Sequence, residues 1–164
     1  MIKSSIVLIG MMGSGKTTVG KILAREIKYN FIDTDQLIED QENKTCKQIL
    51  TENGETFFRY LELNLLSSID YENTVIATGG GLPIFNNNIE ILLKKSLVIY
   101  IKTSIEDLAK RLKNDNKRAI SKEISSLKKI LNNRKKTYDL AHQTILTKNK
   151  TVNEIVKEIK SLIF

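Results

Sequence analysis

The chain has 164 residues, of which 41% are hydrophobic and 27% charged, and this balance is typical of a water-soluble globular protein of one domain. The absence of any run of 18 apolar residues excludes a membrane-spanning helix. The net charge of +7 is unevenly divided, −4 over residues 1–93 and +11 over residues 94–164, so the basic second half needs its own explanation.

That basic half could bind a nucleic acid, bind an anionic small molecule, or consist of lysine-rich helix faces in water. Aromatic residues make up only 6% of the chain, and the basic half lacks the base-stacking pattern of single-strand-binding proteins. We therefore interpret most basic residues of this half as solvent-exposed surface residues, and a few of them as ligands of phosphate groups. We expect no nucleic-acid partner and no membrane partner.

Cysteine and histidine each occur once. One cysteine cannot form an internal disulfide and one histidine cannot build a histidine metal site, so we interpret Cys46 and His142 as packing or surface residues. The apolar run near the N-terminus follows a single basic residue, Lys3, and meets no cleavage site. We expect a cytoplasmic protein with no signal peptide and no structural metal.

Residues 10–17 read G-M-M-G-S-G-K-T and match the phosphate-loop pattern G-x-x-x-x-G-K-[ST]. A β-branched apolar run at 5–9 predicts a buried strand before the loop, and apolar spacing over 17–26 predicts a helix after it. In such a loop the backbone N–H groups form an anion nest, Lys16 reaches the β- and γ-phosphates, and Thr17 ligates Mg²⁺. A chance glycine turn is the alternative, and the flanking elements disfavour it.

A very short second strand is predicted at 31–32, and Asp33 and Asp35 follow it. Ligands bind at the carboxyl edge of a parallel sheet, and alternation along extended backbone would put both carboxylates on one side. One could lie in the outer shell of Mg²⁺ and the other on a substrate hydroxyl. The alternative is that Asp35 caps the helix that follows.

Residues 36–70 are predicted to be mainly helical, with Thr45 capping a short helix, a turn at Gly54 and a longer helix after it. Arg59 lies on the longer helix. It could be an exposed charge paired with Glu62, or it could be held rigidly for a bidentate contact with a carboxylate. The spacing alone leaves both readings open.

A third strand at 74–78 ends in three glycines, 79–81, which indicates backbone that approaches a ligand closely. A fourth strand is predicted at 96–101. Neither strand ends in the acidic residue that ligates Mg²⁺ in many phosphate-loop enzymes, so Asp33 and Asp35 are the natural substitute. The sequence also lacks an Asn-Lys-x-Asp signature, which counts against a GTPase.

The remaining chain completes an alternating α/β pattern. A helix is predicted over 103–112, followed by a polar stretch, 113–121, with the character of a mobile lid loop. Arg118 is the residue that such a lid would deliver to a transferring phosphoryl group. A helix carrying Arg134 follows, and the chain ends with a strand and an amphipathic helix between 144 and 163.

Together these motifs resemble the shikimate kinase family, within the nucleoside-monophosphate-kinase-like phosphate-loop fold. The resemblance implies an α/β, three-layer P-loop NTPase fold, with a central five-stranded parallel sheet flanked by helices and a lid loop at about 113–121, in one domain over residues 1–164. The motifs that carry it, in order, are Gly10 to Thr17, Asp33-Thr34-Asp35, Gly54-Glu55 with Phe58-Arg59 and Glu62, Gly79-Gly80-Gly81, Arg118, and Arg134 with Tyr138 and Ala141.

The resemblance also implies an activity, the transfer of the γ-phosphoryl group of ATP to the 3-hydroxyl of shikimate in the chorismate pathway of aromatic amino acid biosynthesis. Asp35 would orient or deprotonate that hydroxyl, and Arg59 and Arg134 would grip the shikimate carboxylate. Arg111 would stack on adenine, and Arg118 would close over ATP. We expect a monomer that uses ATP and Mg²⁺ and binds small molecules only.

The site residues that the resemblance implies fall into four groups. The catalytic residues are expected to be Asp35, Lys16 and Arg118. ATP is expected to contact Gly13, Ser14, Gly15, Lys16, Thr17, Thr18, Arg111 and Arg118. Shikimate is expected to contact Asp35, Arg59, Gly80, Gly81 and Arg134. Magnesium is expected to be held by Thr17 and Asp33.

One motif departs from the family, whose lid usually reads Arg-Pro-Leu-Leu where this chain has Arg118 followed by Ala-Ile-Ser. Without the proline, Arg118 is not restricted to extended conformations, so closure of the lid and ATP affinity are the properties that we expect to differ. The rival functions are another small-molecule kinase of this fold, such as a gluconate or nucleoside-monophosphate kinase, and a nucleotide-dependent nucleic-acid-binding module. The aspartate pair, Arg59 and the triple glycine favour shikimate.

Overall fold

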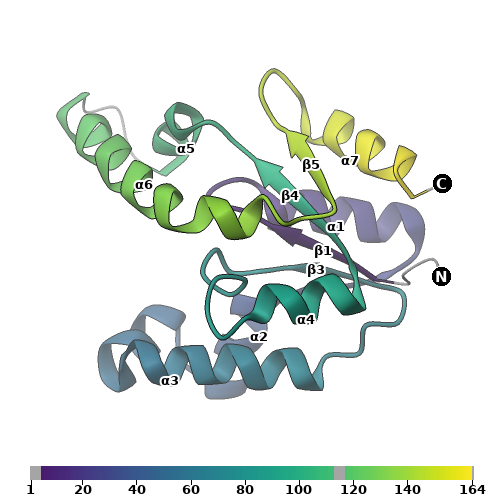
Figure 1. Cartoon of the computed structure of the whole chain (residues 1–164), viewed down its shortest axis with the longest axis horizontal. Coiled ribbons are helices and arrows are strands. Elements are labelled where there is room, and N and C mark those ends of the chain that lie inside the picture. Colours follow the sequence, from purple (N-terminus) through teal and green to yellow (C-terminus); the bar gives the residue numbers. More distant parts are fainter. Residues whose placement is uncertain (1–4, 113–116, 164) are drawn as a thin grey trace.

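The computed structural model describes residues 5–112 and 117–163, without the side chains of residues 117–122 (Figure 1). The strands are β1 (Ser5–Ile9), β2 (Asn30–Asp33), β3 (Thr74–Ala77), β4 (Leu97–Lys102) and β5 (Gln143–Leu146). The helices are α1 (Lys16–Ile27), α2 (Thr34–Glu42), α3 (Cys46–Ser68), α4 (Asn88–Lys95), α5 (Ile105–Leu112), α6 (Lys117–Tyr138) and α7 (Val152–Ser161).

The five strands form one parallel sheet in the order β2-β3-β1-β4-β5. β1 is the central strand, and its Val7 pairs with Ile76 of β3 on one side and Val98 of β4 on the other. All five residues of β1 are buried, as expected of a β-branched run with neighbours on both edges and both faces. The five-stranded parallel sheet predicted from the sequence is confirmed.

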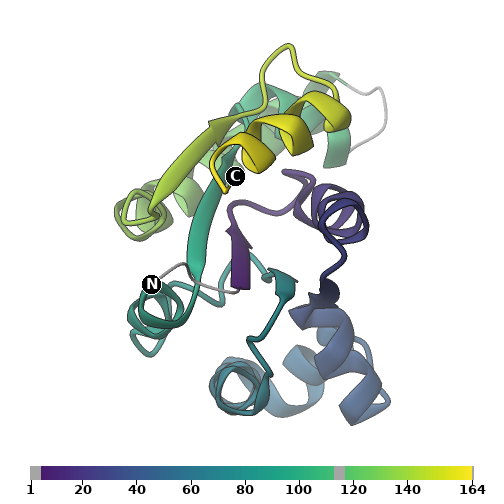
Figure 2. The same cartoon turned by 90° about the vertical axis from the view of Figure 1, so that its right-hand side faces the viewer.

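Two hydrophobic clusters cover the two faces of the sheet, so the molecule has three layers (Figures 1 and 2). Alternate residues of β1 supply the two clusters, because successive side chains of a strand point to opposite faces. Ile6 and Leu8 join the cluster beneath α1 and α7, whereas Val7 and Ile9 join the cluster beneath α3, α4 and α6. The predicted α/β three-layer architecture is confirmed.

Helix α3 contains the N-terminal cap and the glycine turn that the sequence predicts for it. Thr45 caps it in a capping box with Gln48, since each side chain bonds to the other residue's backbone N–H. Gly54 interrupts the helix with φ at 83°, a left-handed value that favours glycine. The predicted cap and turn are therefore confirmed, and the second half of α3 leaves the kink in a new direction with Arg59 on it.

Helix α4 is absent from the sequence-based prediction. It has eight residues, and Asn87 at its N-cap adopts a left-handed conformation (φ 54°) without a side-chain hydrogen bond to the helix. Ser, Thr, Asp and Asn mark a helix start when their side chains bond the first N–H groups, and that bond is missing here. Burial of Ile89 and Leu92 against the sheet stabilises α4 instead.

Only the last residues of the predicted lid, 113–121, fall within the part of the chain that the structure describes. α5 ends at Leu112 and α6 begins at Lys117, so the last residues of the predicted loop are helical. Their sequence contains no proline, which leaves helical conformations open to them. Residues 113–116 and the side chain of Arg118 lie outside the described part, so the lid and the role of Arg118 stay predictions.

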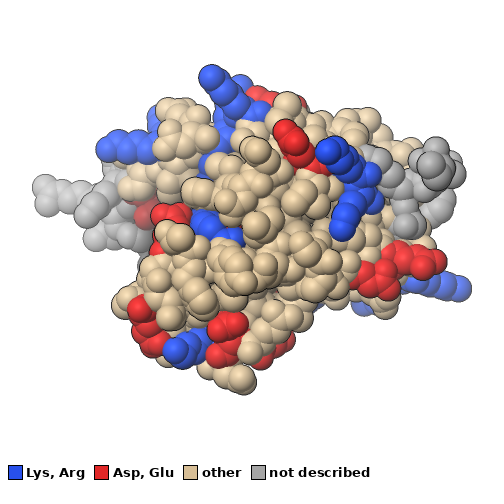
Figure 3. All heavy atoms as spheres, turned by 60° about the horizontal axis from the view of Figure 1, so that its bottom comes forward, with Lys and Arg blue, Asp and Glu red and all other residues tan. Residues whose placement is uncertain are grey.

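Charged side chains of both signs are scattered among uncharged ones on the face shown in Figure 3, which therefore carries no continuous basic surface. Among the described residues, no helix combines the length and the apolar character needed to cross a membrane. The expectation that the protein has no nucleic-acid partner is untested and stays a prediction.

Candidate active site

The phosphate loop joins β1 to α1 at the carboxyl edge of the sheet. Its glycines Gly10, Gly13 and Gly15 all have φ values between 77° and 144°, which side chains disfavour. At Gly10 a Cβ would also lie 2.6 Å from the carbonyl oxygen of Ile101. The three glycines of the motif are therefore required by the backbone geometry, as the sequence predicts.

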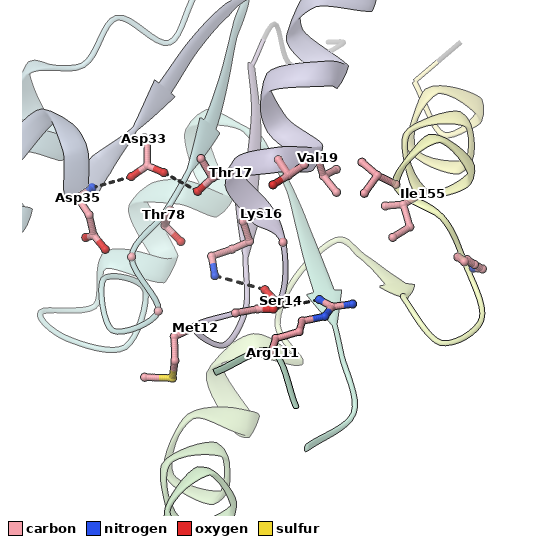
Figure 4. Close-up of a pocket in the computed structure, with 17 residues that line it drawn as sticks. Met12, Ser14, Lys16, Thr17, Val19, Asp33, Asp35, Thr78, Arg111 and Ile155 are labelled. Carbon is pink, nitrogen blue, oxygen red and sulfur yellow. Dashed lines mark hydrogen bonds between the residues drawn. The ribbon is translucent and has the colours of Figure 1, made fainter. Parts of the chain in front are cut away.

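Lys16 folds back over this loop (Figure 4). Its buried ammonium group donates to the carbonyl oxygens of Gly10 at 2.9 Å and Met11 at 2.8 Å, and to Ser14 Oγ at 3.3 Å. Burial lowers the pKa of Lys16 to about 8, against the opposing attraction of Asp35 and then Asp33. The ammonium group thus sits among loop oxygens that phosphate oxygens could replace.

Asp33 links the phosphate loop to helix α2. Its Oδ2 accepts a hydrogen bond from Thr17 Oγ1 at 2.6 Å, and its Oδ1 accepts from the backbone N–H groups of Asp35 and Gln36 at 3.1 and 3.3 Å. Asp33 is therefore the N-cap of α2. The alternative reading of the sequence, that Asp35 is the cap, is wrong because α2 begins at Thr34, two residues earlier than a cap at Asp35 would imply.

The pair formed by Thr17 and Asp33 offers a hydroxyl and a carboxylate oxygen to the same place, and hard cations such as Mg²⁺ prefer oxygen ligands. Among the described residues, no group of three or more His, Cys, Asp or Glu could hold a metal ion by itself. The oxygen pair fits a magnesium ion that takes its other ligands from phosphate groups and water.

Asp35 lies in the first turn of α2 with its carboxylate at the cleft (Figure 4). The predicted extended backbone between Asp33 and Asp35 is wrong, because the chain turns helical at Thr34, but both residues line the same cleft as expected. Burial, and then the charge of Asp33, raise the pKa of Asp35, while Lys16 opposes the rise. A carboxylate made more basic in this way is a better acceptor for a hydroxyl proton.

The three glycines after β3 each face a different charged side chain, at a distance that leaves no room for a Cβ. An alanine Cβ would lie 2.4 Å from Asp35 Oδ1 at Gly79, 2.8 Å from Arg134 Nη1 at Gly80, and 2.8 Å from both terminal nitrogens of Arg59 at Gly81. None of the three has a left-handed φ. Glycine here therefore lets charged groups approach the backbone closely, and a Cβ at any of the three positions would push the end of the facing side chain away.

Arg59 is held on several sides. Its guanidinium group pairs with Glu62 at 2.7 Å and Glu55 at 3.1 Å and lies 4.0 Å from the centre of the Phe85 ring. Glu62 is only 1% exposed, and burial raises its pKa although Arg59 acts in the opposite direction. The predicted pairing with Glu62 is confirmed, but the side chain of Arg59 is only 15% exposed and rigidly placed rather than free in solvent.

Arg134 reaches the glycine loop from α6. Its Nη1 atom is buried and has no hydrogen-bond partner among the described residues. An unpaired buried donor on a cation is costly, and an anionic ligand would satisfy it. Arg59 and Arg134 thus approach neighbouring glycines from different helices, an arrangement suited to one planar carboxylate.

The cleft has a volume of about 590 Å³ and runs from Asp35 along the phosphate loop to α7. At its far end Arg111 donates to the Gly13 carbonyl at 3.0 Å, opposite Val19 and Ile155 (Figure 4). Thr18 also lines it, as predicted for an ATP contact. A guanidinium facing aliphatic side chains forms a slot that suits a flat, nitrogen-rich ring.

Lys150, Val152 and Ile155 line the same end of the cleft but are missing from the predicted site. They lie more than 130 residues after the phosphate loop and belong to no phosphate-binding motif. Packing of α7 against α1, in the cluster that contains Val19 and Ile155, brings them there. Only a prediction of tertiary packing could have found them.

Comparison with known proteins identifies the family to which the chain belongs. A family model described as "Shikimate kinase" matches residues 12–164. A shikimate kinase from Sulfurihydrogenibium sp. is 41% identical over 157 residues, covering 94% of this chain and 95% of the relative. The chain belongs to the shikimate kinase family. Members of this family are kinases, so the protein is a phosphotransferase that uses ATP.

Solved structures agree with the family. The crystal structure of shikimate kinase from Bacteroides thetaiotaomicron has a TM-score of 0.89 at 31% identity, covering 97% of each chain. Shikimate kinase from Acinetobacter baumannii in complex with shikimate has a TM-score of 0.86 at 33% identity, covering 98% of this chain and 92% of that one. A gluconokinase from Sinorhizobium meliloti reaches only 0.57 at 17% identity, a likeness of fold alone.

Replacement of Gly79 by alanine tests the close approach of Asp35. The Cβ would displace the Asp35 carboxylate, so we expect kcat with shikimate to fall about 100-fold while KM for ATP changes less than about twofold. Gly20→Ala is the steric control, because its Cβ would meet the Phe31 ring at 2.6 Å instead of the Asp35 carboxylate. Steady-state assay of both variants decides the matter, and a kcat for Gly79→Ala within threefold of wild type would contradict the prediction.

Proposed function

We propose that the protein transfers the γ-phosphoryl group of ATP to the 3-hydroxyl of shikimate, giving ADP and shikimate 3-phosphate. The observation that carries the proposal is the glycine loop 79–81, with one carboxylate and two guanidinium groups against its three residues and the phosphate loop beside it. Shikimate has hydroxyls and one carboxylate, and this loop offers a complementary group to each kind.

On the acceptor side, Arg59 and Arg134 bind the carboxylate and fix the direction of the ring. Asp35 accepts a hydrogen bond from the 3-hydroxyl. That bond directs the hydroxyl oxygen of shikimate toward the γ-phosphorus of ATP. Positioning of this kind supplies much of the rate enhancement in phosphoryl transfer, whose transition state needs little covalent assistance. The rigid pairing of Arg59 with Glu62 supports the assignment, since the guanidinium group is placed before the substrate arrives.

On the nucleotide side, the loop N–H groups and Lys16 contact the phosphates, and adenine occupies the slot beside Arg111. Thr17 and Asp33 would hold Mg²⁺, which when bound neutralises charge on the β- and γ-phosphates. The oxygen pair at 2.6 Å supports this assignment. Arg118 is assigned to the closing lid on the resemblance alone.

During transfer a bond forms between the 3-hydroxyl oxygen and the γ-phosphorus, and the bond from that phosphorus to the β–γ bridging oxygen breaks. The hydroxyl proton passes to Asp35, whose raised pKa favours its acceptance, and from there to solvent. The new negative charge on the leaving ADP faces Lys16 and the loop N–H groups. We expect the enzyme to act in the cytoplasm, on the composition of the chain, and as a monomer, on the resemblance.

Replacement of Arg59 by lysine tests the carboxylate assignment. Lysine keeps the charge but loses the bidentate fork and the stacking on Phe85, so we expect KM for shikimate to rise at least about tenfold with KM for ATP unchanged. Arg111→Lys is the reciprocal control, because it should raise KM for ATP alone. A normal KM for shikimate in Arg59→Lys, measured by ADP release, would refute the assignment.

A second prediction concerns protons taken up when the nucleotide binds. With a pKa of about 8, Lys16 in the free enzyme is about 90% neutral at pH 9 and about 10% neutral at pH 7, and phosphate contact restores its charge. Binding of a non-hydrolysable ATP analogue with Mg²⁺ should therefore take up about 0.9 proton at pH 9 and about 0.1 at pH 7.

Calorimetric titration in buffers of different ionisation enthalpy measures this uptake directly. Lys16→Met should abolish it if the analogue still binds. Lys21→Met, a change at an exposed lysine of the same helix, should leave it intact. Equal uptake at the two pH values in the wild-type protein would show that the Lys16 pKa is not lowered in the way described.

A further inference from the structure

Tyr138 ends helix α6 in a position that core packing alone does not explain. The residue is fully buried, and its ring lies 5.1 Å from the ring of Tyr100 on β4, tilted by 34°. Its hydroxyl extends beyond this stack and donates to the carbonyl oxygen of Gly80 at 2.6 Å. A side chain of the helical layer is thereby tied to the loop that follows β3, on the other side of β1 from β4.

Gly80 lies close both to the phosphate loop and to Arg134, which belongs to the acceptor side of the site. A Cβ on it would lie 2.8 Å from Arg134 Nη1 and 3.4 Å from both the Gly10 carbonyl oxygen and the Met12 nitrogen. The Gly80 backbone therefore fills the space between the phosphate loop and the guanidinium group on the acceptor side. A small rotation of its peptide group would change both contacts.

The neighbours of Gly80 are anchored by bonds of their own. The Gly79 N–H donates to Thr34 Oγ1 at 2.9 Å, and the Gly81 carbonyl accepts from the Ile84 N–H at 3.0 Å. The carbonyl of Gly80 between them is bound by the phenol of Tyr138. Side chains of α2 and α6 thus bind the Gly79 N–H and the Gly80 carbonyl, whereas the Gly81 carbonyl is bound by the backbone of the loop itself.

Arg134 and Tyr138 lie four residues apart, one turn, on the same helix. The bond from Tyr138 to Gly80 therefore also fixes the distance between the loop and the Arg134 guanidinium. Arg134 Nη1 has no hydrogen-bond partner of its own among the described residues. Burial raises the pKa of Tyr138 against the opposing effect of Arg134, so the phenol keeps its proton and remains a donor at neutral pH.

We propose that Tyr138 is a positioning residue for the acceptor, which holds Gly80 and Arg134 in the relative placement that binds the carboxylate of shikimate. This inference rests on the proposed function, because it takes Arg134 as the carboxylate ligand. The phosphate loop keeps its own internal bonds from Lys16 and from Arg111. The effect of losing the Tyr138 bond should therefore fall on the acceptor and spare the nucleotide.

Tyr138→Phe is the test, since it removes the hydroxyl and keeps the ring stack. It leaves the Gly80 carbonyl without its donor, and we expect KM for shikimate to rise about tenfold, with kcat within about threefold and KM for ATP within about twofold of wild type. Tyr100→Phe is the matched control, because it removes a buried phenol hydroxyl from the facing ring without touching Gly80. It should leave both Michaelis constants unchanged.

Melting temperatures of both variants separate positioning from packing. A structural role alone would lower the melting temperature of Tyr138→Phe without changing KM for shikimate, and that result would overturn the inference. Equal increases in the two Michaelis constants would overturn it as well. If the wild-type protein releases no ADP in the presence of shikimate, the proposed function fails instead, and this outcome is visible before any variant is compared.

Discussion

The parallel pairing of β1 with β3 and β4 is the constraint on which the site depends. Because parallel strands all end at the same edge, the phosphate loop after β1 emerges beside the glycine loop after β3, and Asp33 at the end of β2 lies next in the order. The strand order thus places the glycine loop between the aspartates and the phosphates. Segments separated by some 70 residues in the chain become neighbours through this strand pairing, before any contact between their loops is made.

Burial dominates the electrostatics of this edge. It is the largest cause of the lowered pKa of Lys16 and of the raised pKa values of Asp35 and Glu62, and in each case opposite charges nearby only partly offset it. The charged groups of the site are therefore costly to keep in their present places. A phosphate entering beside Lys16, or a carboxylate entering beside the unpaired Nη1 of Arg134, would relieve the cost of those two cations, which are in place before the ligand arrives.

The sequence was sufficient for the features that depend on local signals. The phosphate loop, the cap at Thr45, the kink at Gly54 and all five strands follow from glycine spacing, capping chemistry and apolar runs, which act over a few residues. The carboxyl edge of the sheet was also predicted to bind ligands, and Asp33, Asp35, Gly79 and Gly80 line one cleft there. The residues alone could not separate the roles of Asp33 and Asp35, because that depends on α2 starting at Thr34, two residues earlier than a cap at Asp35 would imply.

Features that depend on tertiary packing could not be predicted from local sequence patterns. Asn87 precedes helix α4 but its side chain makes no hydrogen bond to the helix, so burial of the apolar face stabilises α4 in place of a cap. Lys150 and Ile155 line the cleft only because α7 packs on α1. The pairing of each of the three glycines with a different charged side chain could not be predicted from local patterns either, because those side chains lie on three different helices.

The central claim is that this edge accepts shikimate rather than another phosphoryl acceptor. The most direct measurement is ADP release by the purified protein with ATP and Mg²⁺, comparing shikimate, gluconate and the nucleoside monophosphates side by side. Turnover with shikimate alone is the predicted result. Turnover with another acceptor while shikimate is inert would leave the fold and the phosphate loop intact, and would contradict the assignment of Asp35, Arg59 and Arg134 to the acceptor.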